Sequence, residues 1–250
     1  MSKLELPQVT LVAMTSVNID ATIRAMLYSM RNGRGIRFGD AVLITHEKPA
    51  RLPDCIRYAH IDRLKEIDDF NYHMVYDLGD YIETDFAMVV HADGFVVHPE
   101  KWRDDFLAYD YIGSPWPLPD AGDTTSYRDI NGTVHRVGNS VSIRSKRLMT
   151  FPKKNNVPWV GEYAFGRMWY NEDGFITTKI RHLLEADGMR IAPLELAVYF
   201  GHETMIPEIE GITPFCFHKW NGTNSRYPDF TKTAPAYRLQ HLGAFLKTRY

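Results

Sequence analysis

The sequence is poor in cysteine and has no long hydrophobic run. Its two cysteines, Cys55 and Cys216, are too few for a disulfide-rich scaffold or a four-thiolate zinc site. Its apolar runs fall short of the roughly eighteen residues that a transmembrane helix needs. The first of them, 9–14, is too short and too weakly flanked by cations for a signal peptide. We therefore expect a soluble, cytoplasmic protein.

The sequence also lacks an excess of charge of either sign. The 29 lysines and arginines nearly balance the 31 aspartates and glutamates, and the formal net charge of −2 argues against a general nucleic-acid-binding protein. Hydrophobic residues at 44% and charged residues at 24% exclude a globally disordered chain. A chain of 250 residues can bury a sizeable core, and we expect a single domain over 1–250.

The first part of the chain alternates between strand-like and helix-like segments. Apolar residues at helical spacing predict one helix through 23–30, capped by Asn18 or Asp20, and another over 72–82. Repeated β-α-β units with short connections imply an α/β fold, in which helices flank a mostly parallel central sheet. Short runs without polar alternation predict strands that are buried on both faces, at 9–14, 40–46, 56–61 and 86–91.

The later part of the chain is less regular. The stretch 117–136 is rich in Pro, Asp, Gly, Thr and Ser and predicts a long surface loop, and 151–171 is irregular and rich in aromatic residues. A helix is expected over 175–186. The segment 237–250 has an apolar stripe surrounded by basic groups, which fits either a helix docked on the domain or a weak anchor at the inner face of a membrane.

The tripeptide His91-Ala-Asp93 ends the last predicted strand and is the first candidate site. Side chains at i and i+2 of an extended strand point to one face, and ligands of open α/β sheets bind beyond the carboxyl ends of strands. A carboxylate there can hold a divalent cation that bridges a diphosphate, and a histidine can ligate or hydrogen-bond it. The alternative is a turn at Asp93-Gly94 beside a satisfied, partly buried histidine.

Two later segments combine glycine with groups that suit sugar or phosphate. In 110–116, Trp116 offers a flat apolar face for a sugar ring or a base, although a tryptophan in the core is an equally good interpretation. In 137–144, Gly138 allows close backbone approach, and a polar strand face ends in Arg144. The alternative for the latter is an edge strand with one solvated face.

Two pairs of residues near the end of the chain could carry proton transfer and charge neutralisation. Glu172 and Asp173 precede a predicted helix, where they could cap it or supply a general base. His218 could complete a metal site begun by Asp93, and Lys219 could neutralise phosphate charge. The alternative for His218 is a packed core histidine between aromatic residues.

Taken in order, these segments resemble the GT-A nucleotide-sugar glycosyltransferases, and more closely a bacterial family of glycosyltransferase-like domains. That family shows an acid-containing strand end, D-Y-I-G-[SA]-P-W, a V-G-N segment that ends in R-S, an E-D pair and a late H-K-W. The matching segments here are 91–93, 110–116, 137–145, 172–173 and 218–220. The resemblance implies a GT-A-like (Rossmann-like) domain, with a nucleotide-sugar-binding half over 1–116 and an acceptor-side half over 117–250.

The resemblance also implies residue roles. Asp93 and His218 would bind Mn²⁺ or Mg²⁺ and the donor diphosphate, with His91 as a further candidate ligand where the usual D-x-D motif has its first acid. Asp173 and Glu172 would be the catalytic pair, with Asp173 as the base. The implied donor-binding residues are Thr15, Ser16, Asn18, His91, Asp93, Gly138, Asn139, Arg144 and Lys219, and the candidates for stacking on sugar or acceptor are Trp116, Trp159 and Trp220.

The implied function is transfer of a sugar from a nucleotide-diphosphate sugar to a hydroxyl of a glycan or lipid-linked glycan, with inversion. Such transfer needs positive charge at the leaving diphosphate and a carboxylate within hydrogen-bond reach of the attacking hydroxyl. Two alternatives stay open. One is a nucleotidyltransferase or sugar-nucleotide hydrolase on the same kind of site, and the other is a non-catalytic carbohydrate-binding protein on a degenerate transferase fold.

Overall fold

The computed structural model describes residues 2–123, 127–159, 162–164, 167–169, 171–219 and 226–232. The strands are β1 (Leu4–Met14), β2 (Ile36–Thr45), β3 (Arg57–His60), β4 (Phe86–Val89), β5 (Gly94–Val96), β6 (Tyr111–Pro115), β7 (Val137–Ser145), β8 (Glu162–Ala164), β9 (Arg167–Trp169), β10 (Gly201–His202) and β11 (Cys216–His218). The α-helices are α1 (Ile19–Arg31), α2 (Ile67–Tyr76), α3 (Lys146–Lys154), α4 (Glu172–Gly174), α5 (Arg181–Ala186) and α6 (Leu194–Phe200). The 3₁₀ turns are η1 (Leu78–Tyr81), η2 (Pro99–Lys101), η3 (Asp104–Ala108) and η5 (Pro207–Ile209), and η4 (Phe175–Lys179) is a π-helical turn.

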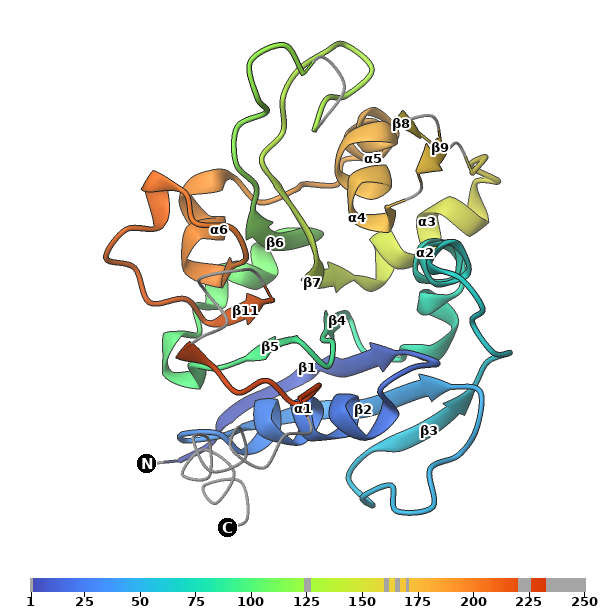
Figure 1. Cartoon of the computed structure of the whole chain (residues 1–250), viewed down its shortest axis with the longest axis vertical. Coiled ribbons are helices and arrows are strands. Elements are labelled where there is room, and N and C mark those ends of the chain that lie inside the picture. Colours follow the sequence, from blue (N-terminus) through green and yellow to red (C-terminus); the bar gives the residue numbers. More distant parts are fainter. Residues whose placement is uncertain are drawn as a thin grey trace.

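The central sheet has six strands in the order β3-β2-β1-β4-β7-β6 (Figure 1). β1 pairs in parallel with β2 and β4, β2 pairs in parallel with β3, and β7 runs antiparallel to both of its neighbours. The mostly parallel α/β sheet expected from the sequence is therefore confirmed. Because the chain places β2 and β3 on one side of β1 and β4 on the other, the strand order switches between β1 and β4.

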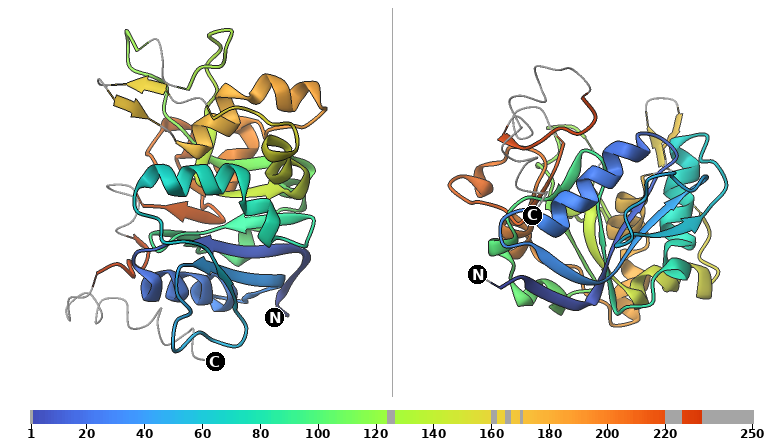
Figure 2. Two further views of the ribbon diagram at one scale, coloured as in Figure 1. Left: turned by 90° about the vertical axis from the view of Figure 1, so that its right-hand side faces the viewer. Right: turned by 90° about the horizontal axis from the view of Figure 1, so that it is seen from below.

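Helices cover both faces of this sheet (Figure 2). In β1, Leu11 and Ala13 pack on the side of α1, whereas Val12 and Met14 pack with residues of α2, η1 and α3. Successive side chains of a strand point to opposite faces, so a strand covered on both sides buries all of them. This explains why 9–14 is an unbroken apolar run.

Some predicted boundaries are wrong. The helix expected over 72–82 begins at Ile67 and ends at Tyr76, and the 3₁₀ turn η1 follows it. The early start has a local cause: the Asp69 carboxylate accepts hydrogen bonds from the backbone N–H groups of Lys65 and Glu66, which forms a capping box. The helix expected from Phe175 begins at Glu172 and includes the π-helical turn η4.

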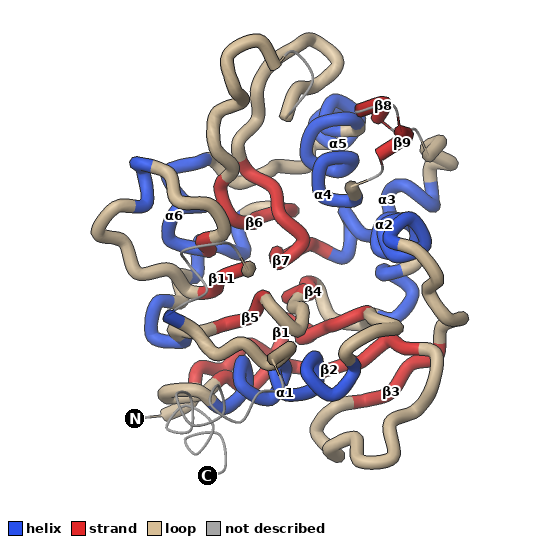
Figure 3. The backbone as a smooth tube through the Cα atoms, in the orientation of Figure 1, coloured by secondary structure: helices blue, strands red, loops and turns tan. Residues whose placement is uncertain are grey.

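A small second sheet, in the order β10-β11-β5, pairs two strands of the segment 201–218 with β5, the strand that follows β4 in the chain. β11 is antiparallel to β5, and this register places His218 opposite Gly94. The described parts of the connection 117–136 form an extended loop between β6 and β7, as expected (Figure 3). The segment 237–250 lies outside the described residues, and within those residues no helix has the length and apolar character to cross a membrane.

Candidate active site

A cavity of about 610 Å³ lies at the carboxyl ends of β1 and β4, where the strand order switches. Open α/β sheets bind ligands at such a place. The loop 14–18 after β1, the start of α2 and the turn 91–93 after β4 line it. The residues from later in the chain include Ser140 of β7, 171–173, Glu203 and His218.

The turn after β4 carries His91 and Asp93 into this cavity. The strand does not continue through them, because His91 and Gly94 exchange backbone hydrogen bonds of 2.7 and 3.3 Å across a tight turn. The predicted i, i+2 strand geometry is therefore wrong, although both side chains line the cavity. The His91 imidazole is fixed by a 2.8 Å hydrogen bond between its Nε2 and the Ser140 hydroxyl.

Asp93 and His218 meet because β5 and β11 pair. The His218 Nε2 lies 3.7 Å from Asp93 Oδ1, and its Nδ1 lies 2.9 Å from Glu203 Oε1. Gly94 makes this approach possible: a Cβ at this position would lie 2.6 Å from His218 Cδ2, well inside contact distance. The sequence predicted a pair of Asp93 and His218, but it did not indicate Glu203 as the group that orients the histidine.

The positive charge of His218 faces two carboxylates, those of Asp93 and Glu203. Partial burial alone would lower the pKa of His218, but Asp93 and Glu203 raise it to about 10, so the ring is an imidazolium at neutral pH. Burial would raise the pKa of Asp93, and the His218 cation instead lowers it to about 2. Burial and the nearby His218 charge lower the pKa of His91 to about 4, which keeps that ring neutral.

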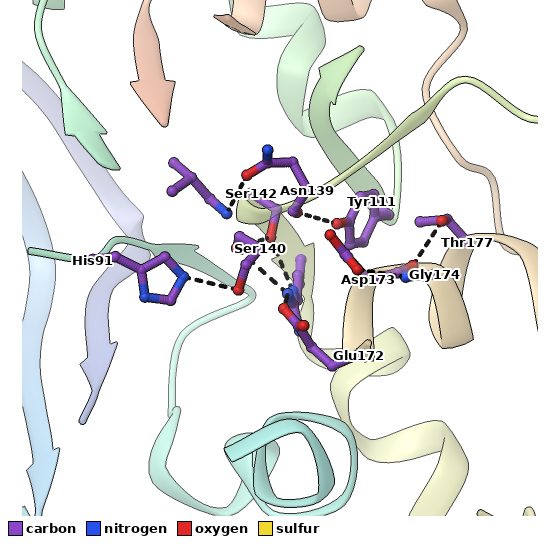
Figure 4. A network of polar contacts seen from close by, with 11 residues as sticks. His91, Tyr111, Asn139, Ser140, Ser142, Glu172, Asp173, Gly174 and Thr177 are labelled. Carbon is purple, nitrogen blue, oxygen red and sulfur yellow. Dashed lines mark hydrogen bonds and ion pairs between the residues drawn. The ribbon is translucent and has the colours of Figure 1, made fainter. Parts of the chain in front are cut away.

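Glu172 lines the cavity and forms a buried ion pair. Its Oε1 lies 3.0 Å from Nη2 of Arg144, and the two side chains are 4% and 0% exposed. The Arg144 Nε donates to the Ser142 hydroxyl, and its guanidinium lies over the Tyr111 ring. Figure 4 shows the polar network of this region, from His91 and Ser140 to Glu172 and Asp173. Burial raises the pKa of Glu172, but Arg144 lowers it by more, so Glu172 stays ionised.

Asp173 is the next residue, and its pKa is shifted in the opposite direction. Burial, followed by the like charge of Glu172, raises the pKa of Asp173 to about 7. Its Oδ1 accepts a 2.7 Å hydrogen bond from the Gly174 N–H, and the π-helical turn η4 follows at once. π-helical turns interrupt α-helices most often at functional sites. A carboxyl group of this pKa exchanges its proton readily near neutral pH.

Only part of the predicted donor site lines the cavity. Within the part of the chain that the structure describes, the cavity lining omits Gly138, Asn139, Arg144, Lys219, Trp116 and Trp159. Trp220 lies outside the described residues. The predicted residues that do line it are Thr15, Ser16, Asn18, His91, Asp93, Glu172, Asp173 and His218.

Four of the omitted residues, Gly138, Trp116, Asn139 and Trp159, make contacts within the fold. A Cβ on Gly138 would lie 2.0 Å from the ring of Trp116, so this glycine makes room for a buried tryptophan that stacks on Tyr127 at 4.6 Å. Asn139 has a left-handed backbone with φ of 80°, and its carbonyl accepts a hydrogen bond from the Tyr111 hydroxyl. The Trp159 ring packs on aromatic residues of α2 and η4.

The sequence analysis did not indicate Phe70 or Asn71, and both line the cavity; Ser140, expected on a polar strand face suited to hydroxyl or phosphate, lines it too. Phe70 packs edge-on against the His91 ring at 5.7 Å. Both Phe70 and Asn71 lie on α2, whose start was predicted too late. The signal that could have found them is the capping box at 66–69, which moves the helix start back to the cavity.

The fold matches solved glycosyltransferases of the GT-A type. A structure of an active-site mutant of LgtC aligns over 94% of this chain and 95% of its own, at 14% sequence identity and a TM-score of 0.57. A structure of galactosyltransferase LgtC in complex with donor and acceptor sugar analogs aligns over the same shares, at 13% identity and a TM-score of 0.53. At these identities the likeness establishes the fold.

The sequence comparisons are more limited. No curated protein matches the chain. One family model matches residues 61–218, a span that runs from the end of β3 through α2, the turn after β4 and the buried ion pair to His218. The chain thus belongs to the family described as "Protein of unknown function (DUF5672)".

Proposed function

We propose that the protein is a glycosyltransferase that moves a sugar from a nucleotide-diphosphate sugar to a hydroxyl group of a glycan or lipid-linked glycan. One observation carries the proposal. A single cavity on a GT-A fold holds a cationic histidine paired with a carboxylate, His218 with Asp93, and a separate carboxyl group, Asp173, that titrates near neutral pH. These are the two kinds of group that glycosyl transfer needs.

The donor would lie along the wall formed by β1 and the turn after β4. Thr15, Ser16 and Asn18 would contact the nucleoside, and the diphosphate would lie beside His218. The loop after β1 is held in place because the Ser16 hydroxyl accepts a 2.9 Å hydrogen bond from the Leu64 N–H. Lys219 is exposed beside His218 in the chain and would add positive charge at this end.

Asp93 and His218 would also fit a divalent cation, provided that the cation displaces the Nε2 proton of His218. Mg²⁺ is commonly held by one or two protein groups together with substrate phosphates, and a metal-ligating histidine usually donates its other N–H to a carboxylate, as His218 does to Glu203. No group of three or more His, Cys, Asp or Glu side chains suited to a metal occurs among the described residues. A bound Mg²⁺ or Mn²⁺ would supply positive charge to the leaving diphosphate.

Asp173 would act as the base in the transfer. Its carboxylate would take the proton of the acceptor hydroxyl while the oxygen forms a bond to the anomeric carbon. The bond between that carbon and the diphosphate oxygen breaks, its electrons stay on the diphosphate, and the nucleoside diphosphate leaves with inversion at carbon. Glu172 would not touch the acceptor, because its carboxylate is bound to Arg144 and is 4% exposed.

The acceptor would approach from the side of the cavity that is formed by residues of 117–250. The division into a donor half over 1–116 and an acceptor half over 117–250 stays a prediction, and residues of both ranges line the cavity. Attachment to the inner face of a membrane through 237–250 also stays a prediction.

A donor panel with product analysis tests the proposal. UDP-glucose, UDP-galactose, UDP-N-acetylglucosamine and GDP-mannose would each be incubated with a mixed glycan acceptor pool, with and without Mn²⁺. Transfer releases nucleoside diphosphate only with acceptor, nucleotidyl transfer releases pyrophosphate, and hydrolysis needs no acceptor. Asp173→Asn should keep donor affinity and lower the turnover number by about 10²–10⁴. Glycan binding without turnover of any donor would instead indicate a binding protein.

A further inference from the structure

An asparagine of α2 occupies a position where the fold calls for an apolar residue. The buried face of the helix and the following turn is formed by Asn71, Met74, Val75 and Leu78, which recur at helical spacing. The last three belong to the hydrophobic core. Asn71 is 1% exposed, and it is the one member of this stripe that lines the cavity.

The Asn71 amide is a cost to folding. Within the described residues its Nδ2 is buried and has no hydrogen-bond partner. Burying an amide without a partner is unfavourable, and asparagine is also a weak helix former. Residues that break the local rules of folding without a compensating contact are expected at functional sites, where a ligand supplies the missing partner.

The position of Asn71 selects the kind of ligand group. Its neighbour Phe70 packs against His91, and α2 also packs against α4, the turn that carries Glu172 and Asp173. Asn71 therefore lies on the helix that borders the two carboxyl groups of α4. A diphosphate would be repelled there, whereas a sugar hydroxyl would not.

The chemistry of the amide matches the same group. A side-chain amide offers both a donor and an acceptor, and a hydroxyl group does the same. We propose that Asn71 binds a hydroxyl of the transferred sugar and is a specificity-determining residue for the donor. The inference rests on the proposed function, because it assigns the sugar of the nucleotide-sugar donor to this wall of the cavity.

A pair of variants tests the inference through stability and binding together. Asn71→Leu removes the amide at similar volume, so it should raise Tm by on the order of 3 °C while weakening UDP-sugar binding about ten-fold. Binding of UDP should change less than two-fold, because UDP lacks the sugar. Ser114→Ala is the matched control: Ser114 is 0% exposed, its Oγ is also buried without a partner in the described chain, and it does not line the cavity.

Thermal unfolding and isothermal titration calorimetry with UDP and with the UDP-sugar selected by the donor panel give the readout. Asn71→Ala, measured alongside, covers the case in which leucine does not fold. Equal loss of UDP and UDP-sugar affinity, or an unchanged UDP-sugar affinity, would overturn the assignment and leave the proposed function intact. If the unaltered protein bound no nucleotide sugar of the panel, the proposed function and this inference would both fall.

Discussion

The buried pair of Arg144 and Glu172 allows a sharp test, because the chain holds a second arginine–carboxylate pair of the same length at its surface. Arg144 lies 3.0 Å from Glu172 with both side chains at most 4% exposed, and Arg147 lies 3.0 Å from Asp187 with side chains 49% and 51% exposed. The two pairs differ mainly in their burial. Replacing the arginine of each pair therefore measures how much burial adds to the free-energy cost of losing the pair.

Arg144→Met should destabilise the protein by about 3–5 kcal/mol, because it leaves the Glu172 charge buried without its partner. For a chain of this size that corresponds to a fall in Tm of roughly 6–20 °C. Arg147→Met should cost about 1 kcal/mol or less, since solvent screens an exposed pair. The combined change of Arg144→Met with Glu172→Leu should recover most of the loss, because an apolar pair of similar volume needs no charge compensation.

Urea unfolding followed by tryptophan fluorescence and by circular dichroism would measure the four proteins. A loss for Arg144→Met no larger than that for Arg147→Met would refute the structural role of the pair. If Arg144 instead contacts the donor, as the family resemblance implies, Arg144→Met would weaken nucleotide binding while leaving the free energy of unfolding nearly unchanged. The two interpretations therefore predict opposite results in the two assays.

Three further predictions concern the cavity. Asp93→Ala should abolish transfer and weaken UDP binding at least ten-fold in calorimetry with little change in Tm, because Asp93 serves the cavity and not the core; unchanged turnover would contradict this. The pKa of Asp173 is raised to about 7, so this base becomes protonated as the pH falls below 7. The value of kcat/KM at pH 6 should therefore be about one tenth of its plateau at high pH. A flat profile between pH 5 and 8 would exclude Asp173 as the base. Gly94→Ala should displace His218 from Asp93 and lower the histidine pKa from about 10, which NMR titration of the imidazole would detect; an unchanged titration would show that the turn absorbs the methyl group.

The sheet could be predicted from the sequence because its burial is uniform. The second halves of β1 and β2 are covered on both faces and buried at every position, which leaves a mostly apolar run that is easy to recognise. The sequence places the start of α2 too late because the first turn buries no residue: Ile67 is exposed, and Asp68, Asp69 and Phe70 are half-buried. A hydrogen-bonded capping box at Glu66 and Asp69 sets the start of this helix, although no buried apolar face marks its first turn.

The site residues could be predicted only where they are neighbours in the sequence. The Glu172–Asp173 pair and the turn at Asp93 are contiguous in sequence, and they line the cavity. Glu203 reaches His218 only through the pairing of β11 with β5 and β10, so no local pattern marks it. Gly138 illustrates a related point: a glycine indicates close approach, but the sequence does not say what approaches, and in the structure the Trp116 ring lies beside it.

The contrast between satisfied and unsatisfied polar groups separates these cases on physical grounds. Arg144 lies in the core with a carboxylate, a hydroxyl and an aromatic ring around it, and Asn139 uses its side-chain oxygen and its carbonyl within its own strand and with Tyr111. Asn139 is thus satisfied within the fold, whereas the Nη1 of Arg144 is buried without a hydrogen-bond partner among the described residues. Asn71 has an amide nitrogen that no described residue meets, and Asp173 keeps a carboxyl group whose charge the surroundings disfavour. Because folding alone would select against both, their place in the cavity is the strongest physical reason to expect that a ligand completes them.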